Sequence, residues 1–173
     1  MKYAISKDVL LIHAAGNDNE NLELESNHNY PNRIYADKSG VASNWIEVGA
    51  SGFKDDESLK ASFSNYGKTM VDVFAPGVRI NSTTPKSTYA VYDGTSMASP
   101  VVAGLAPLIR SYYPKLTALQ VKDIIMKSAI KINHDVSIAD DNGAERSVPF
   151  SELCVTGGVV NAYTALKLAA TYK

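Results

Sequence analysis

A run of apolar residues from Val9 to Ala15 constrains the fold of this chain more than any other stretch of the sequence. A strand that is apolar on both faces fits a parallel sheet covered on both sides, not a sheet with one face in water. Gly16 and Asn17 follow the run directly, so they would lie at the carboxyl end of that strand. Ligands bind at such ends in open α/β sheets. The run therefore predicts an α/β fold and a first position for a functional site.

The rest of the sequence indicates a single domain over residues 1–173. Two stretches, 19–43 and 131–151, are predicted to lack regular structure. The other predicted elements are a helix tail at 2–7, strands at 45–49 and 70–74, a hairpin of 78–84 with 89–92, a helix from 96 to 113, a helix from 118 to about 129 capped by Thr117, and an amphipathic helix within 160–172. Strands followed mainly by helices are typical of a layered α/β structure.

The charge balance excludes two classes of partner. The chain has 17 Lys and Arg against 18 Asp and Glu, a formal net charge of −1. This balance provides no basic surface for a nucleic-acid backbone or an anionic membrane face. No apolar run is long enough to span a membrane, and the single Cys154 cannot form an internal disulfide. We therefore expect a globular domain with neither a nucleic-acid nor a membrane partner.

A glycine-containing turn leads into the predicted helix at Ser96. A serine at a helix start has two interpretations. In the first it is an N-cap, whose oxygen accepts a backbone N–H of the first turn. In the second it is a nucleophile, because the free N–H groups and the positive end of the helix dipole would stabilise an oxyanion beside it. Helix statistics alone favour the first interpretation.

The residues around Ser96 reverse that preference. The string Gly94-Thr95-Ser96-Met97-Ala98-Ser99-Pro100 resembles the nucleophile motif of the subtilisin-like serine proteases, the subtilases. Ala14-Ala15-Gly16-Asn17 is similar to the family segment that carries the oxyanion-hole asparagine. Further segments in the family's order are Ala61–Gly67, Phe74–Gly77 and Gly158–Ala162. The resemblance covers nearly the whole chain and implies a subtilisin-like three-layer α/β fold around a parallel sheet.

The resemblance also implies a role for each matched position. Ser96 would be the nucleophile that attacks the scissile carbonyl, and its own backbone N–H would be one oxyanion donor. Asn17 would supply the second donor from its side-chain amide. Ala14, Ala15 and Gly16 would form a wall of the pocket for the substrate residue before the cut. The implied activity is that of a serine endopeptidase, which hydrolyses peptide bonds through an acyl-enzyme on Ser96.

The chain departs from the family pattern at the other two members of the catalytic triad. The subtilase triad runs Asp, His, Ser along the chain, and no Asp-Ser-Gly, Asp-Thr-Gly or His-Gly-Thr occurs here. Asp141-Asn142-Gly143 has the spacing of the aspartate motif but follows the serine, so we interpret it as a turn. We therefore expect a truncated catalytic domain, the carboxyl-terminal half of the subtilase fold.

None of the three histidines, His13, His28 and His134, stands in a family histidine motif. An ordinary structural or surface role is favoured for each, because a base must also lie within hydrogen-bond reach of Ser96. A serine hydroxyl is a weak nucleophile without a base, so we expect the isolated chain to be inactive. A less favoured alternative is a different hydrolase or esterase that has recruited one of these histidines.

The remaining expectations concern partners, metals and location. A half-domain would expose a sheet edge and apolar faces, so we expect self-association. The alternative to an enzyme is a non-catalytic remnant that binds peptides or a partner at that edge. No cofactor or metal is expected; family members often bind calcium, but Asp18, Glu20, Glu23 and Glu25 match no ligand pattern. By resemblance, the parent protein would act on peptides or proteins in an extracellular or periplasmic location.

Overall fold

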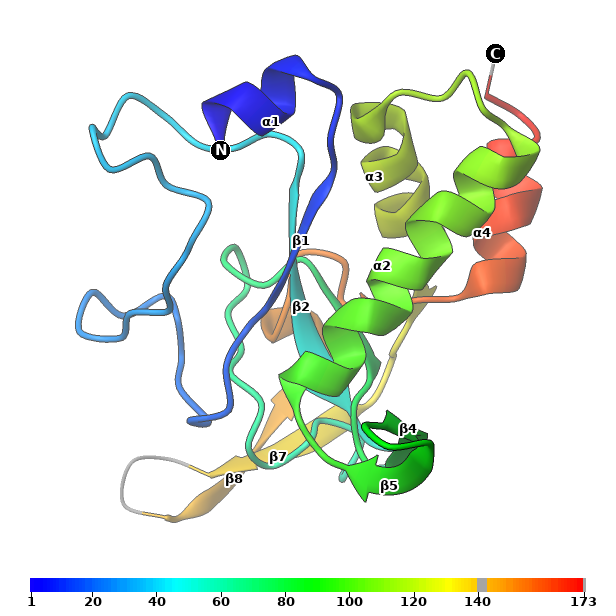
Figure 1. The fold of residues 1–173 in the computed structure, drawn as a ribbon. Coiled ribbons are helices and arrows are strands. Elements are labelled where there is room, and N and C mark those ends of the chain that lie inside the picture. The colour runs from blue at the N-terminus through cyan, green and yellow to red at the C-terminus, as the bar shows by residue number, and fades with distance from the viewer. Residues whose placement is uncertain (140–142, 173) are drawn as a thin grey trace.

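A parallel sheet forms the centre of the computed structural model, which describes residues 1–139 and 143–172. The sheet has five strands in the order β1-β2-β3-β9-β6 (Figure 1). The first four strands run parallel, and β6 is antiparallel to β9. Their bounds are Leu11–Ala14 for β1, Trp45–Ser51 for β2, Val73–Pro76 for β3, Gly158–Val159 for β9 and Ile130–Lys131 for β6. The predicted α/β class is confirmed.

Three helices cover one face of this sheet (Figure 1). They are α2 (Thr95–Tyr112), α3 (Ala118–Lys127) and α4 (Ala162–Ala169). Of the three, α2 lies against β1, β2 and β3. Ile46 and Val48 of β2 are fully buried with Val102 of α2 in the same apolar core. Burial of these side chains fixes the position of α2, whose amino-terminal end lies where β1 ends.

The other face packs against short elements and loops. Phe74 of β3 meets Phe150 edge to face, with 5.0 Å between ring centroids. Phe150 begins the single-turn helix η1 (Phe150–Glu152). The strands β7 (Asp135–Ala139) and β8 (Glu145–Pro149) form an antiparallel hairpin that adds Val136 and Ile138 to this second core. The long segment 19–43 also reaches this face, through the buried Leu22.

Most predicted elements are present, with shifted ends. The hairpin consists of β4 (Ile80–Thr84) and β5 (Thr88–Tyr92), and the short helix α1 (Lys2–Ser6) precedes β1. Thr117 caps α3 through the predicted capping box. Residues 19–43 contain no helix or strand, as expected.

The interpretation of 131–151 as irregular is wrong, because β7 and β8 lie within it. Only one face of that hairpin is buried, so its apolar residues are few and alternate with polar ones, and the pattern is weak. Within the predicted Asp141-Asn142-Gly143 turn, Asp141 and Asn142 lie outside the described residues.

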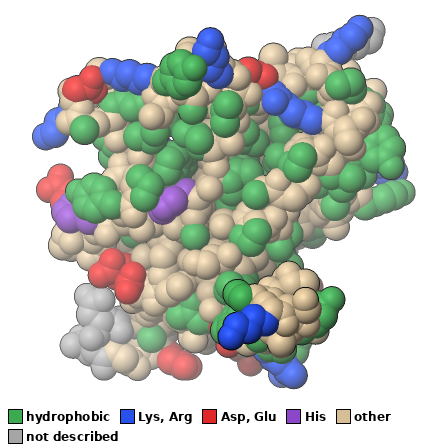
Figure 2. All heavy atoms as spheres, in the orientation of Figure 1, with side chains coloured by type: hydrophobic (Ala, Val, Ile, Leu, Met, Phe, Trp, Pro, Cys, Tyr) green, Lys and Arg blue, Asp and Glu red, His purple; other side chains and the backbone are tan. Residues whose placement is uncertain are grey.

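One edge of the central sheet is open in the described part of the chain. β1 is the terminal strand and pairs with β2 alone. Beside it, α2 leaves small and apolar residues exposed, among them Val101, Ala103, Gly104, Pro107 and Leu108. A hollow of about 470 Å³ lies between β1 and α2, and Figure 2 shows hydrophobic side chains along this side of the molecule. The expected open edge is present, whereas self-association stays a prediction. None of the helices within the described ranges is long and apolar enough to cross a membrane.

Candidate active site

Ser96 lies in the first turn of α2 and is exposed. The N-cap is Gly94, which has no side chain to satisfy the N–H groups of the first turn. Neither the hydroxyl nor the backbone N–H of Ser96 has a hydrogen-bond partner among the described residues. Ser96 therefore does not act as the N-cap, and both groups that the nucleophile interpretation needs are free.

Asn17 is held against the start of the same helix by Thr95. The Asn17 Oδ1 accepts hydrogen bonds from the Thr95 backbone N–H at 2.9 Å and from the Thr95 Oγ1 at 2.8 Å. Because a backbone N–H can only donate, the atom that faces it must be the amide oxygen and not the nitrogen. Asn17 Nδ2 is therefore turned away from Thr95, as a donor with no partner among the described residues. The sequence-predicted donor and the nucleophile segment are thus brought together.

Thr95 itself is buried and links α2 to two consecutive residues of the turn after β1. Its Oγ1 accepts a hydrogen bond from the Gly16 backbone N–H at 3.2 Å while donating to Asn17. The residue is 1% exposed, so these contacts are shielded from water. Thr95 thereby orients the Asn17 amide, a role that its place in the motif string alone does not reveal.

The turn after β1 requires glycine at position 16. Gly16 has φ +100°, and a Cβ there would lie 2.5 Å from Asn65 Nδ2. Asn65 is buried and ties the turn together: its Nδ2 donates to the Ala15 carbonyl, and its Oδ1 accepts the N–H groups of Asp18 and Glu20. The sequence placed Asn65 in a family-like segment but gave no reason for its role.

The central residue of the predicted substrate wall is buried. Ala15 is 0% exposed, main chain included, so it contributes no free surface of its own. The Ala14 carbonyl accepts a hydrogen bond from Asn29 Nδ2 at 3.0 Å, which joins the long 19–43 segment to β1. Ala14 and Gly16 are partly exposed on either side. The wall role of these three residues stays a prediction.

His13 points to the face of the sheet opposite α2. It pairs in register with Glu47, whereas its neighbour Ile12 pairs with Ile46, which is packed under α2. Neighbouring residues of a strand alternate between faces. The His13 Nδ1 donates to Glu47 Oε1 at 2.7 Å, and Trp45 Nε1 donates to Glu47 Oε2 at 2.7 Å. His13 is thus part of a partly buried structural network and no partner of Ser96.

The other two histidines are also engaged elsewhere. His134 bonds through Nε2 to Asp55 Oδ1 at 2.9 Å and through Nδ1 to the Asp135 carbonyl at 3.0 Å. Both contacts raise the pKa of His134, that to the carbonyl most. His28 lies in the 19–43 segment with its ring 5.8 Å from that of Tyr30. None of the three histidines forms a hydrogen bond with Ser96.

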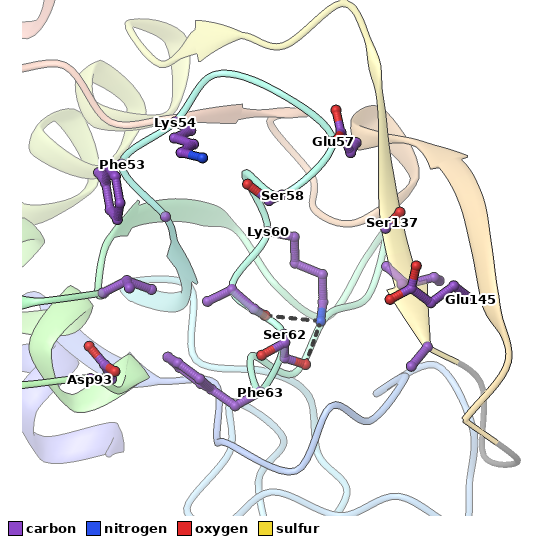
Figure 3. A pocket seen from close by; sticks show the side chains of 15 residues that line it. Phe53, Lys54, Glu57, Ser58, Lys60, Ser62, Phe63, Asp93, Ser137 and Glu145 are labelled. Atoms are coloured by element: carbon purple, nitrogen blue, oxygen red, sulfur yellow. Dashed lines mark hydrogen bonds between the residues drawn. The ribbon is translucent and has the colours of Figure 1, made fainter.

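A hollow of about 480 Å³ adjoins this site (Figure 3). Asp93, three residues before Ser96, lies on its rim, and Phe53 and Phe63 line it with aromatic surface. Ser137 of β7 and Glu145 of β8 form the opposite wall. The hollow thus offers a concave, partly apolar surface close to the nucleophile segment.

Glu23 of the 19–43 segment binds the backbone of a neighbouring loop. Glu23 accepts hydrogen bonds from the backbone N–H groups of Thr69 and Met70 and from the Thr69 hydroxyl. Among the described residues, no group of three His, Cys, Asp or Glu side chains is placed to hold a metal ion.

Cys154 is buried, and burial raises the pKa of its thiol.

Comparison with known sequences identifies the family. The sequence model of the subtilase family matches residues 1–153. The chain belongs to the subtilase family. Subtilisin BL from Lederbergia lenta is 39% identical over 129 residues, which are 75% of this chain and 42% of that protein. M-protease from Shouchella clausii is 39% identical over 126 residues, 73% of this chain and 29% of that protein.

Solved subtilase structures have the same fold. The A-subunit of the AB5 toxin from E. coli gives a TM-score of 0.72 at 22% identity and covers 98% of this chain and 53% of its own. The prenylagaramide maturation protease PagA gives a TM-score of 0.70 at 23% identity, covering 97% and 53%. This subtilase chain spans less than half the length of the two curated relatives named above and about half of these structures.

Proposed function

We propose that this subtilase chain supplies the nucleophile, Ser96, and both oxyanion donors of a serine endopeptidase. One observation carries the proposal: the Asn17 amide oxygen is fixed on Thr95, which leaves the Asn17 Nδ2 free beside the first turn of α2. An oxyanion hole needs donors that are oriented before the reaction, and this hydrogen-bond network supplies that orientation.

The proposed reaction follows from these groups. Ser96 Oγ would attack the carbonyl carbon of a peptide bond, while the hydroxyl proton passes to a base and the carbonyl oxygen becomes negative. The Ser96 N–H, the Asn17 Nδ2 and the amino-terminal end of α2 would stabilise that charge. The base would return the proton to the leaving amine, and water would then hydrolyse the acyl-enzyme. In subtilisin, a member of the same family, loss of the side-chain donor costs about 10²–10³-fold in turnover.

The base is the missing part. The histidines at 13, 28 and 134 bond elsewhere or face away, and Ser96 Oγ has no acceptor for its proton among the described residues. We propose that residues 1–173 alone do not form a competent protease. An oxyanion hole and binding without the triad retain about 10³–10⁴-fold acceleration over water.

Labelling with a fluorophosphonate tests this proposal, because the reagent reacts with activated serines. Intact mass is measured for the chain and for Ser96→Ala, both shown to be folded by circular dichroism. No adduct on either protein is the expected result. A single adduct that disappears in Ser96→Ala would show that a base reaches Ser96 within the chain, and would favour a hydrolase that has recruited a histidine.

A second candidate function is partner or peptide binding without catalysis. The open edge of β1, together with the exposed small and apolar residues of α2, favours it. Self-association through the same edge would follow from the same surface. Ser96→Ala separates the two functions in a protein that contains the whole domain, since it would abolish hydrolysis and leave strand addition unchanged. A monomer in light scattering at high concentration would contradict self-association.

We further propose that the substrates are peptides or proteins, with no nucleic-acid or membrane partner. Acyl transfer on a serine uses protein groups, so no cofactor or metal enters the proposal. Family resemblance supports an extracellular or periplasmic location for the parent protein, and no more specific observation bears on it.

A further inference from the structure

Lys60 is a deeply buried cation with no counter-ion in the described part of the chain. The residue is 3% exposed. Its ammonium group donates to Asn19 Oδ1 at 2.6 Å, to the Ala61 carbonyl at 3.2 Å and to the Ser62 carbonyl at 3.3 Å (Figure 3 shows the two carbonyl contacts). Three N–H donors thus meet three neutral oxygens. Burying an ammonium is costly, so a lysine kept in this position without a carboxylate needs an explanation.

The contact with Asn19 connects Lys60 to the oxyanion segment. Asn19 lies two residues after Asn17 and has φ +57°, a left-handed conformation. Its backbone N–H donates to the Phe63 carbonyl, and its Nδ2 donates to the Ala139 carbonyl of β7. Asn65 holds the residues on either side of Asn19, as described above. The chain that leaves Asn17 is therefore anchored by two buried side chains, Asn65 and Lys60.

We propose that Lys60 is a positioning residue for the oxyanion hole: its ammonium group binds the Asn19 side chain and thereby fixes the turn that carries Asn17. The inference rests on the proposed function for its catalytic meaning. That the position of the Asn17 side chain depends on Lys60 is a statement about the folded chain alone, so it is independent of whether Ser96 reacts.

The surroundings of Lys60 give this role a distinctive pH dependence. Its nitrogen lies 5.3 Å from the centre of the Tyr66 ring. The charged groups that line the same hollow are Lys54, Glu57, Asp93 and Glu145, and none of them is within ion-pair distance. Burial lowers the pKa of Lys60 to about 8. Above that pH the amine has two N–H donors for three acceptors, so the hold on Asn19 weakens.

Stability is expected to change in the opposite direction. The pKa of Lys60 is about 8 in the folded chain and 10.5 for an unperturbed lysine. Between these values the unfolded chain binds more protons, so this group makes the free energy of unfolding rise with pH. A residue with a merely structural role would not loosen Asn17 while the fold becomes more stable.

Nuclear magnetic resonance of the ¹⁵N-labelled chain tests the proposal through the side-chain amide of Asn17. In the wild type we expect this signal to titrate with a midpoint near pH 8. In Lys60→Met the signal should be displaced already at pH 7 and lose that midpoint. Lys60→Arg, which keeps a charge that does not titrate, should restore the wild-type position at pH 7 without the midpoint. The matched control is Lys54→Met, an exposed lysine of the same hollow, which should change neither.

A second variant keeps the test decisive if Lys60→Met does not fold. Asn19→Gly tolerates the positive φ and removes the acceptor, so it should displace the Asn17 signal in the same way with Lys60 intact. An unmoved Asn17 signal in folded Lys60→Met or in Asn19→Gly would overturn the proposal, as would a pH 8 midpoint that persists without Lys60. Fluorophosphonate labelling reports on Ser96 and the NMR signal reports on Asn17. A negative labelling result therefore leaves the test of the Lys60 role unaffected.

Discussion

The turn after β1 and the body of β1 each carry residue types that serine proteases use, and these side chains lie on different sides of the sheet. At the turn, Asn17 is bonded to Thr95 at the start of α2, next to Ser96, and the Asn17 Nδ2 and the Ser96 hydroxyl have no partner within the described residues. On the body of the strand, His13 is held by the carboxylate of Glu47, the arrangement that orients a base in such enzymes. Only three residues lie between His13 and Asn17, yet the alternation of strand side chains directs the imidazole away from α2.

The two regions show that the residue types of a catalytic site are not enough: the side chains must also lie on the same face of the sheet. His13 is partly buried and its Nδ1 bonds to the buried Glu47, so this hydrogen bond stabilises the fold. Thr95 orients Asn17, while the Asn17 Nδ2 and the Ser96 hydroxyl have no partner among the described residues. A bonded pair such as His13 and Glu47 is typical of a structural contact. Oriented donors without a partner, such as the Asn17 amide, are typical of a functional site.

The largest expected effect is at the turn itself. Gly16→Ala would place a Cβ 2.5 Å from Asn65 Nδ2 at φ +100°, so both a steric clash and backbone strain result. We expect a loss of about 3–5 kcal/mol in the free energy of unfolding, measured by urea denaturation. Gly104→Ala is the matched control, because no described atom beyond its chain neighbours and its own helix backbone lies within 4 Å of the added Cβ, and alanine favours helix. It should gain up to about 1 kcal/mol. Similar effects of both substitutions would contradict the glycine requirement at position 16.

A smaller loss is expected on the opposite face. Glu47→Gln puts an NH₂ donor among the donors of His13, Trp45 and Asn29, so at least one buried hydrogen bond is lost. The expected cost is about 1–3 kcal/mol in unfolding free energy. The NMR signals of Asn17 and Thr95 should not move, since they lie across the sheet. Glu57→Gln, an exposed carboxylate without an ion pair in the described chain, should change stability by less than about 0.5 kcal/mol. A displaced Asn17 signal in Glu47→Gln would show that the two sites are coupled.

Thr95→Val tests how the open pair is oriented. The substitution keeps the shape but removes the hydroxyl that joins Gly16 to Asn17, which leaves the Gly16 N–H without its acceptor. We expect a loss of about 1–2 kcal/mol in unfolding free energy and a displaced Asn17 side-chain signal. Thr171→Val removes an exposed hydroxyl at the end of the chain and serves as control. An unchanged Asn17 signal in Thr95→Val would mean that the Thr95 backbone N–H alone orients the amide.

The smallest effect is expected from His134, at the surface. Its folded pKa is raised by the Asp135 carbonyl and by Asp55, so its contribution to stability is complete below the unfolded pKa of 6.5. That contribution is lost as the pH rises through the folded value. His134→Gln should therefore lower the midpoint of thermal unfolding slightly at pH 5 and not at pH 9. Equal midpoints at pH 5 would show that the exposed Asp55 contact is screened by solvent.

The sequence predicted the elements wherever one local signal was strong. The apolar run at β1, the capping box at Thr117 and the turn between β4 and β5 each depend on neighbouring residues, so their positions are nearly right. The hairpin β7–β8 was missed because only one of its faces is apolar. Strands β6 and β9 are two residues long and exist through pairing with each other and with β3, which leaves no local pattern.

By itself the sequence determined the family resemblance, the position of the proposed nucleophile and the absence of the family's aspartate and histidine motifs, because motifs are local strings. Only the tertiary structure decided that Ser96 is not the helix cap, that Thr95 orients Asn17, and that His13 faces away from α2. It also brought Lys60 to Asn19 across 41 positions of chain. These facts depend on which face of the sheet a side chain occupies and on contacts between distant segments, and a buried contact of that kind leaves no periodic trace in the sequence.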